Sequence, residues 1–381
     1  MTDQFQLTED QLAIQEMARR FTADNITPFA AEWDEQHHFP RDVIQMTGEL
    51  GFGAIYVSEE SGGIALGRLE AALIMEAMAY GCPATSAYVS IHNMASWMID
   101  RFGSAELKAR FLPKLVTMEH IASYALTEPG SGSDAAALKT TARLDGDTYV
   151  VNGTKQFISG SGFNDIYVVM VRTGDDKSKG ISCLVVEKDT PGLSFGAPER
   201  KLGWNASPTA QLIFEDCRVP VANRVGAEGD GFRFAMAGLD GGRLNIGACS
   251  LGGAQRCLDE AIKYTKERQQ FGQPIADFQN TQFMLADMAT ELEAARALLY
   301  LAAAKVTAGA PDKTRFSAMA KRLATDSGSN VVNNALQLLG GYGYLKDYPI
   351  ERFWRDLRVH SILEGTNQVM RMIVGRDLLR Q

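Results

Sequence analysis

The sequence predicts an α+β protein built from three successive parts. Three observations support this: apolar residues recur at helical spacing up to about residue 120, β-rich runs separated by turn residues follow, and helical spacing returns in longer segments after Gly229. We therefore predict an N-terminal α-helical domain at 1–120, a β-domain at 121–230 and a C-terminal four-helix bundle at 231–381. A chain of 381 residues also exceeds the roughly 250–300 residues that one core usually serves.

The N-terminal helices have clear start signals. Thr8 followed three residues later by Gln11 predicts a capping box. The apolar face of that helix is formed by Ile14, Met17, Ala18 and Phe21. A second helix is predicted over RDVIQMTGEL, between Pro40 at its start and Gly51 just past its end. Further helices are predicted at about 68–80, 86–102 and 105–115.

The middle region has the composition of β-strands. Its β-branched and aromatic runs, separated by Gly, Asp, Asn and Pro clusters, are IASYALTE, TYVVNGTKQFIS, DIYVVMVRT, GISCLVVEK and AQLIFEDCRV. Runs of this length and number predict a small antiparallel β-barrel or sandwich.

The C-terminal region shows the narrow apolar stripe of bundle helices. The clearest stripe, with spacings of three and four, is Leu285, Met288, Leu292, Ala295, Leu299 and Ala302. Similar stripes occur near 251–262 and 316–324, and a last helix is predicted after Thr366. These segments predict four long helices.

Composition excludes several classes of function. The net charge of −8 and the pI near 5.3 argue against nucleic-acid binding. No apolar run approaches the ~20 residues of a membrane span, and the acidic start MTDQFQLTED lacks a signal peptide, so we expect a cytoplasmic protein that binds no membrane. The five cysteines and five histidines show no ligand spacing, so no metal site is expected.

A glycine-rich segment, YALTEPGSGSDA, allows two interpretations. Gly130-x-Gly132-x-x-Ala135 formally fits a dinucleotide-binding fingerprint, but strand and turn residues follow it where a Rossmann helix would be required. It is therefore either a turn between strands or a loop whose N–H and hydroxyl groups, including Thr127 and Ser133, bind a pyrophosphate or polar heterocycle.

Five ordered motifs resemble the signatures of the acyl-CoA dehydrogenases, and the resemblance covers essentially the whole chain. The motifs are YALTEPGSGSD (124–134), KQFISGSG (155–162), ERQQFG (267–272), QLLGGYGY (337–344) and ILEGTNQVMR (362–371). The family fold has a helical domain, a β-domain and a four-helix bundle with FAD between them, in agreement with the three parts described above. The resemblance also implies an acyl-CoA substrate, an electron-transferring flavoprotein as acceptor, and a homotetramer formed as a dimer of dimers.

The resemblance implies the cofactor site residue by residue. The flavin side is expected at Tyr124, Leu126, Thr127, Gly132, Ser133, Phe157, Ile158 and Ser159, with Ser133 also near the substrate. Thr366 and Gln368 are also expected to bind the cofactor. The adenosine diphosphate side, contributed across a subunit boundary, is expected at Arg268, Phe271, Gln279, Gln337, Gly340 and Gly341. Many relatives carry Trp and Thr at the positions of Phe157 and Ser159, and both replacements keep the aromatic face and the hydroxyl. Without the resemblance, most of these residues would be interpreted as core or as solvated helix faces.

Glu364 is the expected catalytic base. It lies between an apolar run and Gly365, where an apolar setting would raise its pKa, and it would take the α-proton of a thioester. Some relatives place the base just before the position of Arg243, but this chain has Gly242 there. The resemblance also places Asp240, Arg243, Gly365 and Arg376 against the acyl-CoA.

The expected substrate is a short, α-methyl-branched acyl-CoA. Longer stretches resemble the branch of the family that oxidises isobutyryl-CoA in valine breakdown, and Leu363 stands where straight-chain enzymes often present Tyr. Alternatives are another short-chain or 2-methyl-branched acyl-CoA, a flavin oxidase on the same fold, a non-catalytic DNA-associated relative and a helical scaffold. The acidic net charge and the presence of Glu364 argue against the DNA-associated relative, and a flavin absorbance band in the purified protein would rule out the scaffold.

Overall fold

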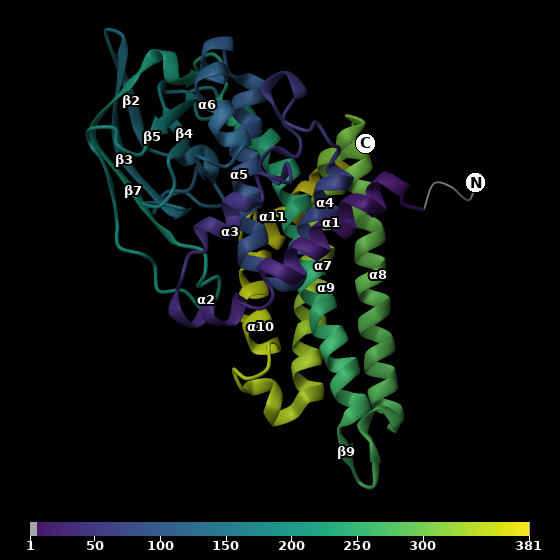
Figure 1. The fold of residues 1–381 in the computed structure, drawn as a ribbon. Helices are drawn as coiled ribbons and strands as arrows, with labels where there is room; N and C mark the ends of the chain where they lie inside the picture. Colours follow the sequence, from purple (N-terminus) through teal and green to yellow (C-terminus); the bar gives the residue numbers. More distant parts are fainter. Residues whose placement is uncertain (1–5, 381) are drawn as a thin grey trace.

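A computed structural model describes residues 6–380 of the chain, so residues 1–5 and 381, at the ends of the first and third predicted domains, lie outside it. A sheet occupies one side of the molecule and long helices extend along the other (Figure 1). The helices before the sheet are α1 (Glu9–Asn25), α2 (Ala30–Gln36), α3 (Arg41–Met46), α4 (Arg68–Gly81), α5 (Pro83–Phe102) and α6 (Ala105–Val116). This confirms the predicted helical N-terminal region.

Local signals explain where the first helices begin and end. The capping box of α1 is present, with Gln11 N donating to Thr8 Oγ1 at 3.2 Å and Thr8 N donating to Gln11 Oε1 at 3.0 Å. The helix α3 is shorter than predicted, because the Thr47 hydroxyl donates to the carbonyl of Ile44 at 2.6 Å and the chain turns there.

The central sheet has eight strands, in the order β6-β7-β3-β2-β4-β5-β8, with β1 added beside β4. The strands are β1 (Ala122–Ala125), β2 (Thr141–Asp145), β3 (Thr148–Ser159), β4 (Ile166–Arg172), β5 (Ile181–Glu187), β6 (Leu193–Phe195), β7 (Thr209–Pro220) and β8 (Arg224–Val225). Most pairings are antiparallel, as predicted, but β1 and β2 each run parallel to β4. Sequence periodicity does not show this, because it fixes which residues face the core and not which strands are neighbours.

Three long helices form the C-terminal part: α7 (Gly231–Glu267), α8 (Gln279–Thr307) and α9 (Lys313–Leu339). The predicted stripe on α8 is buried from Met288 to Ala302. The predicted last helix is α11 (Asn367–Leu378), with only 12 residues, and a further short helix, α10 (Ile350–Arg358), precedes it. Glu364 lies in the segment between α10 and α11, where the chain is not α-helical.

The helices of the first and third parts share one apolar core. Buried residues of α4 and α5 belong to the same cluster as those of α7, α8 and α9. One face of the sheet packs against α5, α6 and the start of α7 in a second cluster, and a third cluster lies within the β-region. A small hairpin of β9 (Gln269–Gln270) and β10 (Gln273–Pro274) lies at the far tip of the long helices (Figure 1). Within residues 6–380, none of the helices is both long enough and apolar enough to cross a membrane.

Candidate active site

Glu364 is held in an unusual backbone conformation against α7. Its φ of 54° is in the left-handed region, which a residue with a side chain adopts only when the surroundings enforce it. A Cβ added to Gly242 would lie 2.6 Å from Glu364 Oε2, so the carboxylate rests directly on the backbone of α7. Although the residue as a whole is partly exposed, Oε2 is enclosed and has no hydrogen-bond partner among the described residues.

This setting changes the acidity of the carboxyl group. Burial raises the pKa of Glu364 to about 7, and the cations of Arg243 and Lys321 oppose that rise. The Tyr124 hydroxyl is also enclosed without a partner in residues 6–380. Burial, with a contribution from the Glu364 charge, holds the pKa of Tyr124 well above its usual value. Glu364 can therefore bind a proton reversibly near neutral pH, as a general base must.

Arg243 connects the expected substrate residues to the base. Its Nη1 donates to Asp240 Oδ1 at 2.7 Å, and its Nε lies 3.4 Å from the backbone oxygen of Glu364. The Thr314 hydroxyl of α9 donates to the other oxygen of Asp240 at 2.7 Å. The structure thus brings Glu364, Gly365, Asp240 and Arg243 together, as expected.

The loop after β1 and the end of β3 also meet. The backbone N–H of Gln156 donates to the carbonyl of Thr127 at 2.8 Å, and the Ser123 hydroxyl donates to the carbonyl of Ser159 at 2.7 Å. The buried Lys155 ammonium donates to Leu126 O at 3.1 Å and to Glu128 Oε1 at 2.8 Å. The segments expected on the flavin side, from Tyr124 to Ser133 and from Phe157 to Ser159, therefore lie next to each other.

Phe157 projects from this surface because of a bulge in β3. Lys155 pairs with Leu212 and Ile158 with Ala210, so two residues of β3 lie opposite one of β7. Phe157 has a φ of 59° and its side chain is 64% exposed. Gly130 and Gly132 face open space, since an added Cβ there would meet nothing within 4 Å.

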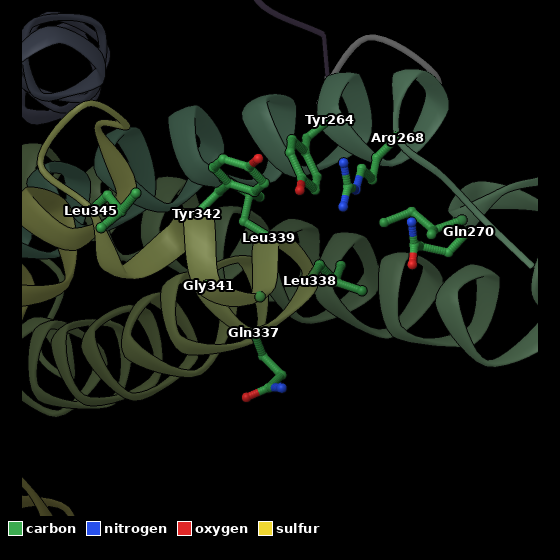
Figure 2. Close-up of a pocket in the computed structure, with 11 residues that line it drawn as sticks. Tyr264, Arg268, Gln270, Gln337, Leu338, Leu339, Gly341, Tyr342 and Leu345 are labelled. Atoms are coloured by element: carbon green, nitrogen blue, oxygen red, sulfur yellow. The ribbon is translucent and has the colours of Figure 1, made fainter.

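A second group of predicted residues lines an open pocket of about 400 Å³ at the far end of the bundle. Arg268, Gln337, Gly340 and Gly341 are among its lining residues. Arg268 extends into it beside Tyr264, whereas the side chain of Gln337 points away (Figure 2). An added Cβ at Gly340 or Gly341 would meet nothing within 4 Å. Phe271, in the hairpin, is 95% exposed and Gln279 begins α8, and neither lines this pocket.

The two groups of residues lie at different levels of α9. Lys321, beside Glu364, and Gln337, beside the pocket, are separated by 16 residues of α9, or about 24 Å at 1.5 Å per residue. One chain therefore does not bring the adenosine-side residues to its own Glu364.

The remaining predicted residues have local roles or none that the fold reveals. The Thr366 side chain caps α11 by accepting from Val369 N at 3.2 Å. Gln368 and Ser133 are exposed. Arg376 is also exposed, nine residues into α11, about 14 Å along the helix from its start.

Sequence reasoning missed three buried cations at the site. Lys321 and Lys155 are fully buried, and Arg68, which is 8% exposed, lies over the ring of Tyr56 at 3.6 Å. Lys and Arg usually extend to solvent, and no pattern in a single sequence marks the exceptions. For Lys321 the only signal is its place beside Ala320 and Ala324 in an apolar stripe.

The residues present fit a flavin dinucleotide. An exposed aromatic ring at a bulge, an enclosed hydroxyl with no protein partner in the described chain, and two pairs of glycines facing open space are features that a bound aromatic and phosphate-containing group would use. Among residues 6–380, no three His, Cys, Asp or Glu side chains are placed to hold a metal ion.

Comparison with known proteins agrees with this geometry. The acyl-CoA dehydrogenase N-terminal, middle and C-terminal domains match residues 8–119, 123–217 and 229–379. Isobutyryl-CoA dehydrogenase, mitochondrial, of Dictyostelium discoideum is 58% identical over 373 residues, 98% of this chain and 90% of that protein. The structure of butyryl-CoA dehydrogenase from Megasphaera elsdenii has a TM-score of 0.96 at 38% identity, covering 98% of this chain and 99% of that one. The FAD complex of PigA has a TM-score of 0.95 at 32% identity, covering 99% of this chain and 100% of that one.

Proposed function

Because the chain belongs to the acyl-CoA dehydrogenase family, whose cofactor is FAD, we propose that it oxidises a short, α-methyl-branched acyl-CoA, with isobutyryl-CoA as its best substrate. The observation that carries this proposal is the Glu364 carboxylate, enclosed against Gly242 with one oxygen unpaired in the described chain. A carboxylate so placed is suited to removing a weakly acidic proton from a thioester.

The residues of this chain perform the proton transfer and hold the developing charge. Glu364 Oε2 accepts the α-proton, and desolvation strengthens it as a base. In the described chain the backbone N–H of Glu364 has no backbone acceptor, so it can donate to a thioester oxygen as negative charge develops there. Arg243 steadies the Glu364 carbonyl from α7. FAD, when bound, accepts the β-hydrogen as a hydride.

The substrate assignment rests on similarity and on Leu363. The relative from Dictyostelium discoideum is named for isobutyryl-CoA. Leu363 precedes the base and packs against the main apolar core. Its side chain would leave a space beside the α-carbon of the substrate that differs from the space left by a Tyr. Valine breakdown is the pathway in which this substrate arises.

The assembly, acceptor and location are further parts of the proposal. The pocket at Arg268 lies too far along α9 to serve the Glu364 of its own chain, which supports a cofactor site completed by a neighbouring subunit. We therefore propose a homotetramer, formed as a dimer of dimers. We also propose an electron-transferring flavoprotein as the electron acceptor and a cytoplasmic location. The cofactor roles of Tyr124, Leu126, Thr127, Gly132, Ser133, Phe157, Ile158, Ser159, Phe271, Gln279, Gln337, Thr366 and Gln368, and the substrate roles of Asp240, Gly365 and Arg376, belong to the same proposal.

The test is a panel of acyl-CoAs mixed anaerobically with the purified yellow protein, with flavin bleaching followed by absorbance. We expect the highest kcat/KM for isobutyryl-CoA, lower values for 2-methylbutyryl- and butyryl-CoA, and a poor rate with octanoyl-CoA. Neighbouring chain lengths should differ by roughly 10- to 200-fold at most, because one methylene is worth only about 1–3 kcal/mol. A best substrate of six or eight carbons would overturn the assignment, and rapid oxygen consumption would indicate an oxidase.

The matched control is Glu364→Gln, which keeps the size of the side chain and removes its basicity. Its flavin content should be normal and its turnover at least ~100-fold lower. Bleaching at the parent rate would show that Glu364 is not the base.

A further inference from the structure

Lys321 is a buried cation that directly supports the loop of the catalytic base. It lies on α9 with no exposed surface. Its ammonium donates to the carbonyl of Gly365 at 2.8 Å and to Asn367 Oδ1 at 2.9 Å. Both acceptors are neutral oxygens, so these bonds leave its positive charge uncompensated. A buried ammonium in such surroundings is unfavourable for folding, and its position needs an explanation.

The loop that Lys321 holds is strained. Glu364 and Gly365 are both left-handed, with φ values of 54° and 88°. Conformations of this kind persist only when neighbouring groups enforce them. A hydrogen bond to the Gly365 carbonyl fixes the Gly365–Thr366 peptide, one residue beyond the base, and so restricts the conformations open to the Glu364–Gly365 backbone.

The same turn of α9 secures the other side of the loop. Asn367 donates to Thr325 Oγ1 at 2.9 Å and to Asp326 Oδ1 at 2.6 Å. Lys321 and Thr325 are four residues apart and therefore lie on one face of the helix. Asn367 is thus oriented by α9 and turns its oxygen toward the ammonium.

Of the two cations that lower the pKa of Glu364, Lys321 is the one without a carboxylate contact in residues 6–380. The charges of Arg243 from α7 and Lys321 from α9 act on Glu364, which in turn acts on Tyr124 from β1 and Tyr56 from the turn after η2 (Phe52–Ala54). The guanidinium of Arg68, from α4, lies over the ring of Tyr56. The two tyrosines are buried and their pKa values are raised, so they remain neutral near pH 7. Arg243 is paired with Asp240 at 2.7 Å. Burial lowers the pKa of Lys321 to about 8, while the charges of Glu364 and Asp326 raise it and that of Arg243 lowers it.

We propose that Lys321 is a positioning residue for the base, which fixes the Glu364–Gly365 backbone through its hydrogen bonds and favours the ionised carboxylate through its charge. This inference rests on the proposed role of Glu364. Lys321 thus makes two contributions, its hydrogen bonds and its positive charge, and each can be measured separately.

The experiment compares two substitutions in the flavin-loaded enzyme. Lys321→Met removes both the charge and the hydrogen bonds, whereas Lys321→Gln removes the charge and keeps a donor. Removing a cation that favours the carboxylate raises the pKa of Glu364, so the acidic limb of kcat/KM should move to higher pH by about one unit in both variants. The limiting kcat at high pH should stay near the parent value in Lys321→Gln and fall in Lys321→Met.

The control is Arg322→Met, which removes a positive charge from the next residue of α9, where the side chain is 45% exposed. Its pH profile should not move, because solvent screens an exposed charge. Flavinated Lys321 variants whose acidic limb stays in place would overturn the proposal. Failure of both variants to fold or to hold flavin would also overturn it, since Lys321 would then be a folding residue only.

A second measurement does not depend on turnover. Thermal unfolding midpoints of the parent, Lys321→Gln, Glu364→Gln and the double variant form a cycle that isolates the interaction of the two side chains. The coupling should be larger at pH 7.5, where most Glu364 is ionised and most Lys321 is protonated, than at pH 5.5, where Glu364 is protonated. Catalytic activity is needed only for the test of the parent enzyme and not for the unfolding cycle. If no acyl-CoA bleaches the parent flavin, the proposed function fails, whereas the cycle still reports on Lys321.

Discussion

The backbone of Gly242 and the carboxylate of Glu364 are in contact in the active site, although they come from different segments of the chain. The added Cβ at Gly242 would lie 2.6 Å from Oε2 and 3.0 Å from Oε1 of Glu364. A side chain at 242 therefore points at the place where the carboxylate now lies. This contact explains why a glycine is needed here when the base is supplied by residue 364.

The contact predicts that the base can be moved. Glu364→Gly combined with Gly242→Glu should recover part of the activity lost in Glu364→Gly alone, because the new carboxylate enters the vacated space. Gly242→Glu alone should be poorly active, since two carboxylates would compete for one position. The rate of flavin bleaching checks this, with thermal stability measured in parallel because a newly buried charge costs stability. A double variant no more active than the single one would contradict it.

The raised pKa of Glu364 also predicts how stability depends on pH. A carboxyl group whose pKa rises from 4.5 unfolded to about 7 folded favours the folded state below pH 4.5, and this advantage is lost as the pH rises through 7. Glu364→Gln has no such titration, so its melting temperature relative to the parent should increase from pH 5 to about pH 7 and level off above that. Thermal melts of both proteins, saturated with FAD, would check this. A constant difference across that range would mean that the carboxyl is not desolvated in the protein.

At the scale of elements, the loop after β1 depends on one buried ion pair with β3. Lys155 and Glu128 are 0% and 7% exposed, and Glu128 also accepts from the backbone N–H groups of Lys139 and Thr140. Removing one partner of a buried pair leaves an uncompensated charge and costs about 3–5 kcal/mol. The loop carrying Tyr124 to Ser133 would then lose its attachment to Phe157 and Ser159.

We therefore predict that Lys155→Met lowers the melting temperature by several degrees and weakens FAD binding. The matched control is Lys177→Met, which breaks an ion pair with Asp134 near the same loop. That pair is 67% and 61% exposed, so its loss should change little. Absorbance at the flavin band and thermal melts check both variants. Equal effects in the two variants would show that burial of the pair is not what matters.

Some features of these elements could be predicted from the sequence and others could not. The start of α1, the buried stripe of α8 and the order of the three parts were predictable, because capping and periodicity are local signals. The parallel pairing of β1 with β4 and the bulge at Phe157 were not, since both depend on which strands become neighbours. Glu364 was named through family motifs, whereas its contact with Gly242 and its support by Lys321 arise from three separate segments meeting in space.

At the scale of the whole molecule, the proposed cofactor site is shared between two chains. Arg268→Ala removes a cation from the pocket at the tip of the bundle, and a guanidinium is suited to a diphosphate. We expect this variant to lose FAD and to dissociate at higher protein concentration than the parent. Sedimentation velocity and flavin absorbance would follow the two losses together. The control is Lys266→Ala, an exposed residue in the last turn of α7. A fully flavinated, tetrameric Arg268→Ala protein would contradict the shared site.

The helix α9 fixes the distance between the base and the distal pocket. Lys321 supports the base at one level and Gln337 borders the distal pocket at another, on the same helix. Inserting or deleting one residue between them would rotate one region by about 100° relative to the other and shift it by about 1.5 Å. The number of residues between 321 and 337 should therefore tolerate no change during evolution. Loops such as 173–180, by contrast, can vary in length without disturbing the register of the site.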